Sequence, residues 1–239
     1  MLIVHKEVLC ISILAAAGYA AYYFLAESSL SEHLTPKKRN MEHRSILRTL
    51  FQRTSGMLLY GVIPLLVMFA AFNRPMSDYG LTFKNFSPTL FWTAALIPGM
   101  ALVGIVSGKH SINQEIYPQM RLSRWNISRA ALSAATWGLY LSAYEFLLRG
   151  LFFFSCWRAF GLTAAVLLNM LVYGLFHLHK GAKEMTGSFV LGAVLCASVF
   201  FTRKIWPALG AHLVLALSTE WSSIHFNPDM KMKWRFRSP

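Results

Sequence analysis

Seven stretches of the chain are long and apolar enough to cross a lipid bilayer, and this pattern limits the possible folds more than any other feature. A membrane-spanning helix needs about 20 mostly apolar residues. The candidate stretches are residues 8–26, 55–72, 89–106, 130–157, 161–178, 187–202 and 205–222. Because they occupy most of the chain, the sequence predicts an all-α fold, a polytopic membrane helix bundle of about seven transmembrane helices.

The cations are distributed unevenly between the segments that connect these stretches. The chain carries 23 Lys and Arg against 10 Asp and Glu, a formal net charge of +13. If residues 27–54, 107–129, 179–186 and 223–239 face the cytoplasm, 16 Lys and Arg lie inside and 6 lie in the opposite segments. Cytoplasmic segments are enriched in Lys and Arg, so the sequence predicts a multi-pass protein with its N-terminus outside and its C-terminus inside.

The first apolar stretch resembles either a secretory signal peptide or a retained helix. Its apolar run is long for a signal peptide, and Lys6 and Glu7 make a weak charged start. The basic residues Lys37, Lys38 and Arg39 follow the stretch instead of preceding it. This order favours a retained helix whose C-terminal end lies in the cytoplasm.

The C-terminal segment from Lys231 to Arg237 alternates cations with apolar and aromatic residues. After a last membrane span, this alternation indicates an anchor at an anionic lipid surface. The sequence contains no nucleic-acid-binding motif. We therefore expect membrane lipids as partners and no nucleic acid, and the sequence leaves the oligomeric state open.

Ionisable and polar residues inside predicted spans are conspicuous because they are costly in a membrane and often functional. Glu145 and Arg149 are four residues apart in the fourth stretch and share a helix face. They form either a structural ion pair or a functional carboxylate whose position is fixed and whose pKa is shifted by the arginine. Asn169, Tyr173 and His177 form a polar stripe on the fifth stretch, where interhelical hydrogen bonds are the simpler interpretation.

The seventh stretch carries His212, Ala216 and Glu220 on one face. Glu220 lies near the predicted cytoplasmic end, where a carboxylate that reaches toward the interface is the simpler interpretation. Together, a Glu, an Arg and two His on three spans predict a functional polar cavity rather than unrelated hydrogen bonds.

The residue types in this cavity suit the activation of water. A carboxylate or imidazole removes a proton from water, and a second imidazole stabilises the charge on a carbonyl oxygen. A zinc site is an alternative, with Glu145, His177 and His212 as ligands, although the chain has no HExxH motif. The helical rise places these three residues at depths that differ by about 14 Å, which is a wide spread for one site.

The ordered motifs resemble those of the CAAX prenyl endopeptidase and bacteriocin-processing (CPBP) family of glutamic-type intramembrane proteases. That family has EExxxR on one helix, FxxxH on the next and HxxxN on a later one. The matching stretches are Tyr144-Glu145-x-x-x-Arg149, Tyr173-x-x-x-His177 and His212-x-x-x-Ala216. The resemblance covers residues 130–222.

The resemblance implies an endopeptidase that hydrolyses a peptide bond of a membrane-associated protein or peptide. It implies that Glu145 and His177 activate water, that Arg149 orients the carboxylate, and that His212 donates to the oxyanion. Tyr144, Asn169, Tyr173 and Glu220 would support the site. The implied mechanism needs no metal or other cofactor, and it leaves open whether the substrate is a prenylated tail, a leader peptide or a sorting tail.

The sequence departs from the family motifs at two positions. Tyr144 stands in place of the first glutamate, and Ala216 stands in place of the asparagine. These departures motivate an alternative, a non-catalytic CPBP-like protein that acts in membrane binding, immunity or scaffolding. A transporter is a third possibility, but the sequence shows no inverted repeat.

We expect a single membrane domain over residues 1–239, in a prokaryotic cell membrane. Residues 1–128 would form N-terminal helices and loops, and residues 129–222 the catalytic-type core helices. Residues 223–239 would form a basic cytoplasmic tail.

Overall fold

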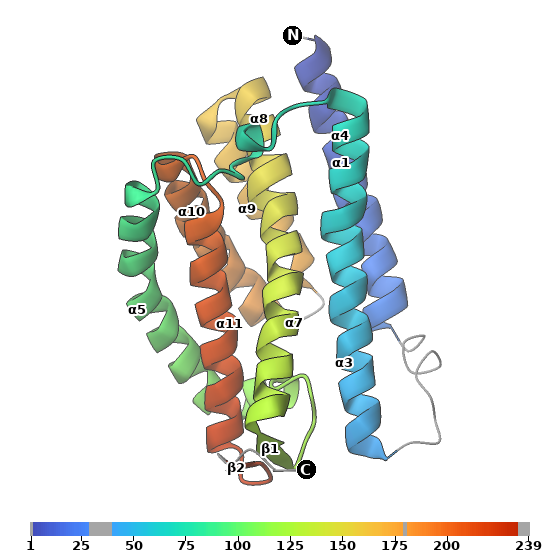
Figure 1. Ribbon diagram of the computed structural model, residues 1–239, viewed down its shortest axis with the longest axis vertical. Helices are drawn as coiled ribbons and strands as arrows, with labels where there is room; N and C mark the ends of the chain where they lie inside the picture. Colours follow the sequence, from blue (N-terminus) through green and yellow to red (C-terminus); the bar gives the residue numbers. More distant parts are fainter. Residues whose placement is uncertain (1, 29–39, 179–180, 234–239) are drawn as a thin grey trace.

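The computed structural model describes residues 2–28, 40–178 and 181–233. In this part of the chain, long helices run along one common axis, and the first and last elements lie at opposite ends of the bundle (Figure 1). The helical segments are α1 (Leu2–Tyr22), η1 (Tyr23–Glu27), α3 (Met41–Met57), η2 (Leu58–Val62), α4 (Ile63–Phe72), η3 (Met76–Tyr79), α5 (Ser87–Lys109), α6 (Ser111–Ile116), α7 (Ile127–Glu145), η4 (Phe146–Phe152), α8 (Phe153–Phe160), α9 (Leu162–Phe176), α10 (Ala182–Thr202) and α11 (Trp206–Phe226). The prediction of an all-α helix bundle is confirmed.

Five helical stretches in the described chain are long and apolar enough to cross a membrane. They are Ile3–Ala26, Met41–Phe72, Ser87–Lys109, Ile127–Phe160 and Glu184–Thr202. The two other predicted spans are also helices, but α9 has 15 residues and α11, with 21 residues, is not among the five. Both pack against other helices of the bundle. The described chain therefore has five long apolar spans, fewer than the seven predicted.

The second span begins earlier than predicted. A continuous helix of 32 residues, Met41–Phe72, replaces the predicted stretch that began at residue 55. The side chain of Asn40 accepts a hydrogen bond from the backbone N–H of Glu42 and caps its start. Arg53, assigned to a cytoplasmic loop, lies on this helix and is buried. The basic cluster Lys37, Lys38 and Arg39 lies outside the described residues.

Two short strands, which were not predicted, lie at the lower end of the bundle in Figure 1. β1 (Arg124–Asn126) and β2 (Lys231–Lys233) pair in parallel, with Trp125 opposite Met232. Trp125 is buried against Met120, Leu122 and Ile224. The remaining residues of the predicted lipid anchor, Trp234–Arg237, lie outside the described part of the chain.

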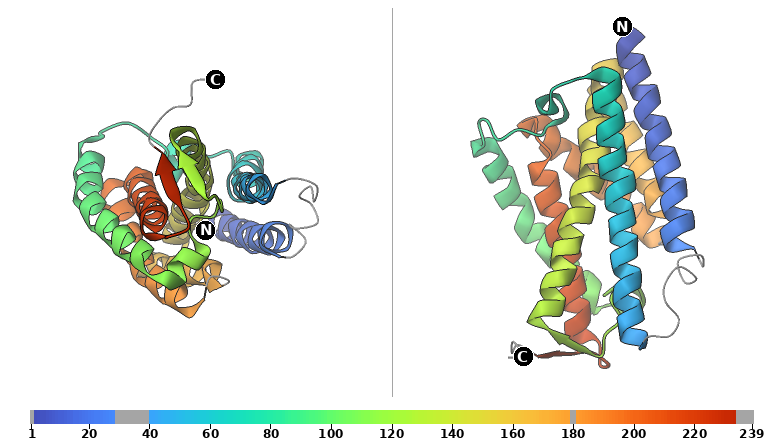
Figure 2. Two further views of the ribbon diagram at one scale, coloured as in Figure 1. Left: turned by 90° about the horizontal axis from the view of Figure 1, so that it is seen from below. Right: turned by 45° about the vertical axis from the view of Figure 1, so that its right-hand side comes forward.

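Close approach of α5 to α11 depends on two glycines of α5. A Cβ atom at Gly104 would lie 1.9 Å from the hydroxyl oxygen of Ser218, and one at Gly108 would lie 2.6 Å from the Cβ atom of Ser222. Small residues spaced four apart let membrane helices pack closely. Seen from below, α11 therefore lies between α5 and α7 (Figure 2).

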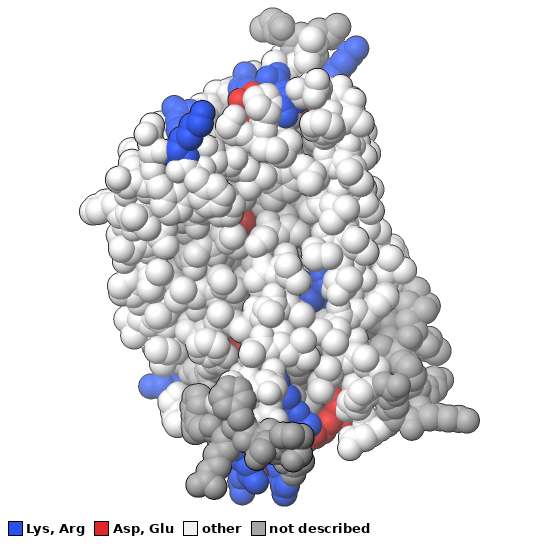
Figure 3. All heavy atoms as spheres, in the orientation of Figure 1, with Lys and Arg blue, Asp and Glu red and all other residues white. Residues whose placement is uncertain are grey.

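The surface carries charge mainly at the two ends of the bundle, with a largely uncharged band between them (Figure 3). Large apolar side chains are exposed along this band, including Leu9, Leu66 and Leu102. Such a surface is expected to face lipid rather than water. With the five long apolar helices, it identifies the chain as an integral membrane protein.

Candidate active site

The centre of the candidate site is a buried pair formed by Glu145 and His212. Glu145 is the last residue of α7, and His212 lies on α11. The Nδ1 atom of His212 lies 2.6 Å from the Oε1 atom of Glu145. Glu145 is 0% exposed and His212 is 9% exposed. The structure thus brings together two predicted residues from different spans.

Arg149 contacts the same carboxylate oxygen of Glu145 as His212 does. Its Nη1 atom lies 3.3 Å from Oε1 of Glu145, and its side chain is fully buried. The guanidinium group also lies over the ring of Tyr173, 4.0 Å from the ring centroid. Arg149 therefore balances the carboxylate charge and restricts where the carboxylate can lie.

The backbone that follows Glu145 is unusual. Residues Phe146–Phe152 form the π-helical segment η4, and all of them are buried. The side-chain amide of Asn169 donates to the carbonyl oxygen of Leu148 at 2.7 Å, and the thiol of Cys196 donates to the amide oxygen of Asn169 at 3.2 Å. π-helical turns are frequent at functional sites. Asn169 therefore holds η4 against α9 and α10, and its amide group bonds to Leu148 and Cys196 rather than to the Glu145–His212 pair.

His177, at the end of α9, is the second imidazole of the site. Its Nδ1 atom lies 2.9 Å from the backbone carbonyl oxygen of Tyr173, and the two rings are 4.7 Å apart. The ring of Tyr144 lies 6.2 Å from that of His177 and 5.8 Å from that of His212. Both imidazoles therefore contact one tyrosine ring, whereas the Glu145 carboxylate pairs with His212 and Arg149 rather than with His177.

The hydrogen-bond partners fix which nitrogen of each imidazole carries the proton. A carboxylate and a backbone carbonyl can only accept hydrogen bonds. The Nδ1–H group of neutral His212 therefore donates to Glu145, and that of His177 donates to Tyr173. In neutral His212, Nε2 then carries the lone pair that a general base requires.

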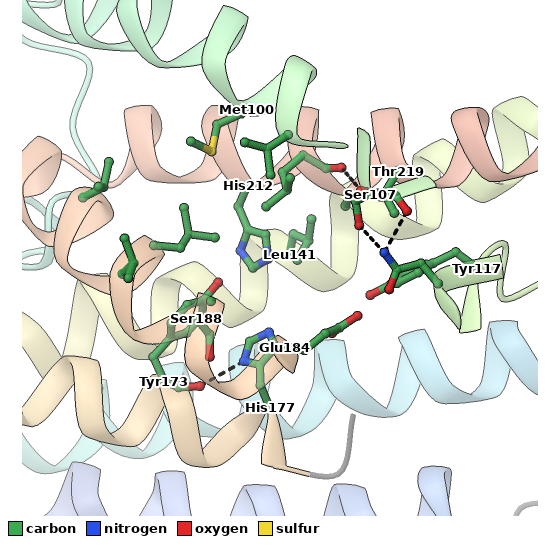
Figure 4. A pocket seen from close by; sticks show the side chains of 18 of the residues that line it. Met100, Ser107, Tyr117, Leu141, Tyr173, His177, Glu184, Ser188, His212 and Thr219 are labelled. Atoms are coloured by element: carbon green, nitrogen blue, oxygen red, sulfur yellow. Dashed lines mark hydrogen bonds between the residues drawn. The ribbon is translucent and has the colours of Figure 1, made fainter. Parts of the chain in front are cut away.

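A cavity of about 710 Å³ adjoins these residues. Tyr144, Tyr173, His177 and His212 line one part of it, and both imidazole rings project into the same space (Figure 4). Apolar side chains of α5 and α10 line its flank, and polar groups such as those of Ser107, Asn113 and Thr219 line another part. Glu145 and Arg149 do not line the cavity and lie behind His212.

Two oxygen atoms beside the pair are buried without a hydrogen-bond partner in the described part of the chain. One is the Oε2 atom of Glu145, and the other is the hydroxyl of Tyr144. Buried polar atoms are normally paired. Because Tyr144 lines the cavity, its hydroxyl indicates where a ligand can complete the hydrogen bonding.

Glu220 belongs to a separate cluster. It is fully buried, pairs with the Nη2 atom of Arg53 at 3.2 Å, and accepts from the Nε1–H group of Trp137 at 2.6 Å and from the hydroxyl of Ser133. The interpretation as a carboxylate that reaches the interface is therefore wrong. Arg53 and Glu220 join α3 to α11, and Glu220 does not line the cavity.

A third buried acid, Glu7, was treated in the sequence only as part of a weak charged start. It accepts hydrogen bonds from the hydroxyls of Tyr79 at 3.0 Å and Ser155 at 2.9 Å, and it pairs with Arg74 and Arg158. Burial and the neighbouring Glu7 raise the pKa of the Tyr79 hydroxyl, which keeps this donor protonated. The sequence signal that could have indicated this buried acid is its position, one residue before the first apolar stretch.

The residues considered for zinc do not form a ligand set. No group of three or more His, Cys, Asp and Glu side chains that could hold a metal ion occurs within residues 2–28, 40–178 and 181–233. The Nδ1 atom of His212 faces Glu145, and that of His177 faces a backbone carbonyl.

Comparison with known proteins adds a family assignment for the core helices. Residues 142–218 match the family model described as Type II CAAX prenyl endopeptidase Rce1-like. No curated protein and no solved structure matches the chain. The matched segment contains the Glu145–His212 pair, Arg149 and His177. Residues 142–218 are therefore similar to this family, and the resemblance carried by the motifs is confirmed over this segment.

Proposed function

We propose that the protein is an intramembrane endopeptidase that hydrolyses a peptide bond of a membrane-associated protein or peptide. The observation that carries this proposal is the 2.6 Å contact between Glu145 and His212 at the edge of the cavity. A carboxylate that accepts from one imidazole nitrogen leaves the other nitrogen as a base directed at the reactants. The match to a protease family supports the same reaction class.

In the proposed reaction, His212 acts as the general base. Its Nε2 atom removes a proton from water while the water oxygen attacks the carbonyl carbon of the substrate. The imidazolium that forms is stabilised by the carboxylate of Glu145, whose position Arg149 maintains. The proton then passes from His212 to the nitrogen of the departing amine, so the peptide bond breaks.

This division of roles differs from the one that the resemblance implies. The family motifs would pair Glu145 with His177 for water activation and would make His212 an oxyanion donor. The contact of Glu145 with His212 supports the opposite choice. We propose that His177, which lines the same cavity, positions the water or the departing amine.

Access from the bilayer is supported by the position of the cavity. Its apolar flank is formed by side chains of α5 and α10, among them Val103, Val106 and Val190, which are exposed at 53%, 46% and 68%. The stacked rings of Trp92 and Phe201, 5.1 Å apart, join the same two helices. We propose that a lipid-anchored or membrane-embedded substrate enters between α5 and α10.

The proposed setting is a prokaryotic cell membrane, with the N-terminus outside, the C-terminus inside and membrane lipids as partners. The excess of cations in the predicted cytoplasmic segments supports this orientation. The proposed reaction uses only side chains of the chain and requires no metal.

The experiment is hydrolysis by the purified protein in proteoliposomes, in water enriched in ¹⁸O. The substrates are a farnesylated CAAX peptide, a leader peptide and a lipid-anchored sorting tail, and mass spectrometry detects the ¹⁸O label in the new carboxylate. We expect the wild-type protein to cleave at least one of them. His212→Ala should lower the rate by about 100- to 10,000-fold, because it removes the general base.

Two results would contradict the proposal. Cleavage by His212→Ala at the wild-type rate would exclude this base, and loss of cleavage on chelation with recovery on adding Zn²⁺ would support the zinc alternative. Leu167→Ala, on the exposed face of α9, is the matched control and should keep full activity.

The second candidate is a non-catalytic CPBP-like protein for binding, immunity or scaffolding. It is favoured by Tyr144 and Ala216, which replace two motif residues. Under this alternative, Glu145→Gln would preserve the cellular phenotype, whereas changes at the exposed apolar faces would abolish it.

A further inference from the structure

We infer that Tyr144 is a further catalytic residue, whose hydroxyl donates a hydrogen bond to the carbonyl oxygen of the peptide bond being cleaved. The inference rests on the proposed function and adds a role that the family motifs do not contain. Tyr144 occupies the position of the first motif glutamate, where a phenol cannot serve as a carboxylate.

The first support is the environment of the hydroxyl. Tyr144 lines the cavity and is 4% exposed, and its ring lies beside both imidazoles. Its hydroxyl oxygen is buried and has no hydrogen-bond partner in the described part of the chain. A buried hydroxyl without a partner destabilises the folded protein, so a ligand that accepts its hydrogen bond compensates for this loss.

The second support is the distribution of donors around the cavity. A carbonyl oxygen that gains negative charge needs a hydrogen-bond donor. When His212 is the neutral general base, its ring proton is on Nδ1 and is donated to Glu145, and the Nδ1–H group of His177 is donated to the Tyr173 carbonyl. Ala216, at the position of the motif asparagine, lines the cavity with a methyl group. The O–H group of Tyr144 supplies the donor that these residues lack.

The step balances without a further reactant. As the water oxygen bonds to the carbonyl carbon, one water proton moves to Nε2 of His212, and the carbonyl π electrons move onto oxygen. Tyr144 donates a stronger hydrogen bond to this oxygen and keeps its proton. When the carbon–nitrogen bond breaks, the electron pair on oxygen re-forms the carbonyl group, and the proton on His212 moves to the leaving nitrogen.

The test compares Tyr144→Phe with Tyr60→Phe in proteoliposomes, with a farnesylated tetrapeptide as the probe. Tyr60 is 1% exposed, its ring lies 5.8 Å from that of Tyr144, and it does not line the cavity. We expect Tyr144→Phe to lower kcat by about 100- to 1,000-fold, as removal of one oxyanion donor does. We expect Tyr60→Phe to keep the wild-type kcat, and Tyr144→Phe to unfold at a temperature no lower than wild type.

A binding measurement separates this inference from the proposed function. The same peptide, with ¹³C at the carbonyl of its farnesylated cysteine, is bound to Glu145→Gln and to Glu145→Gln/Tyr144→Phe, and infrared difference spectra record the labelled carbonyl stretch. A hydrogen bond from Tyr144 lowers this frequency in Glu145→Gln, and the shift should be lost in the double variant.

The outcomes are distinct. If the wild-type protein cleaves the peptide and Tyr144→Phe changes neither kcat nor the carbonyl frequency, the inference is overturned and the endopeptidase proposal stands. If the wild-type protein cleaves none of the three peptides of the hydrolysis experiment but the frequency shift depends on Tyr144, the endopeptidase proposal fails and Tyr144 remains a carbonyl-binding group. If none of the three peptides is cleaved and there is no shift, both are overturned.

Discussion

At the scale of single residues, the described chain contains three fully buried glutamates, each paired with arginine. The pairs are Glu7 with Arg74 and Arg158, Glu145 with Arg149, and Glu220 with Arg53. Burying a charge is costly unless an opposite charge compensates it. Glu145 differs from the other two because its partners include a histidine that lines the large cavity. This difference separates the candidate catalytic carboxylate from two structural ones.

Arg149→Met should destabilise the protein by about 3–5 kcal/mol, because it leaves the carboxylate of Glu145 without its buried countercharge. The double variant Glu145→Gln/Arg149→Met should recover much of this loss, since it removes both charges. The free energy of unfolding in mixed micelles measures both effects. Arg124→Met, at an exposed position, is the control. Equal stability of Arg149→Met and wild type would contradict the account of this pair.

At the scale of elements, two features set the site: the π-helical segment η4 and the close packing of α5 on α11. Glu145 and Arg149 were expected to share a face of a regular helix, and they do so although Arg149 lies in η4. The contact between Glu145 and His212 was not predictable. The depth of each residue was counted along its own helix from the predicted outer end, and this count ignores the tilt of each helix. The predicted spread of depths did not prevent these two side chains from meeting.

Gly108→Ala and Gly104→Ala should each lower the stability by about 1–3 kcal/mol, because the added methyl group overpacks the contact between α5 and α11. Both glycines would place a Cβ atom within 3 Å of α11. Gly99→Ala is the matched control on the same helix, since a Cβ atom there meets nothing within 4 Å. Thermal unfolding in detergent measures the difference. If all three variants unfold at the same temperature, the two helices do not pack as described.

At the scale of the whole molecule, charged ends flank a largely uncharged band, and α1 begins at the end of the bundle opposite to β2 (Figures 1 and 3). The apolar stretches predicted this architecture well because membrane helices carry a strong local signal. The early start of the second span at Met41 was missed because that part of the helix is polar. The burial of Arg53 was missed because it depends on Glu220, 167 residues away. Pairings of this kind depend on tertiary packing and leave no local pattern.

The predicted orientation can be measured with reporter fusions. Green fluorescent protein at the C-terminus should fluoresce, because it folds in the cytoplasm, and alkaline phosphatase at the same site should be inactive. Alkaline phosphatase inserted at Asn85, an exposed position between η3 and α5, should be active because this loop is predicted to lie outside. The reverse pattern of activities would show that the orientation is inverted.

The central claim, that Glu145 acts through His212, is tested most directly by a double-mutant cycle on the rate of peptide hydrolysis. The four proteins are wild type, Glu145→Gln, His212→Ala and the double variant, measured in single turnover on the same peptide. Residues that act as a unit show non-additive losses, so we predict that the double variant is no slower than His212→Ala alone. Multiplicative losses in the double variant would contradict the claim and show that Glu145 acts independently of His212.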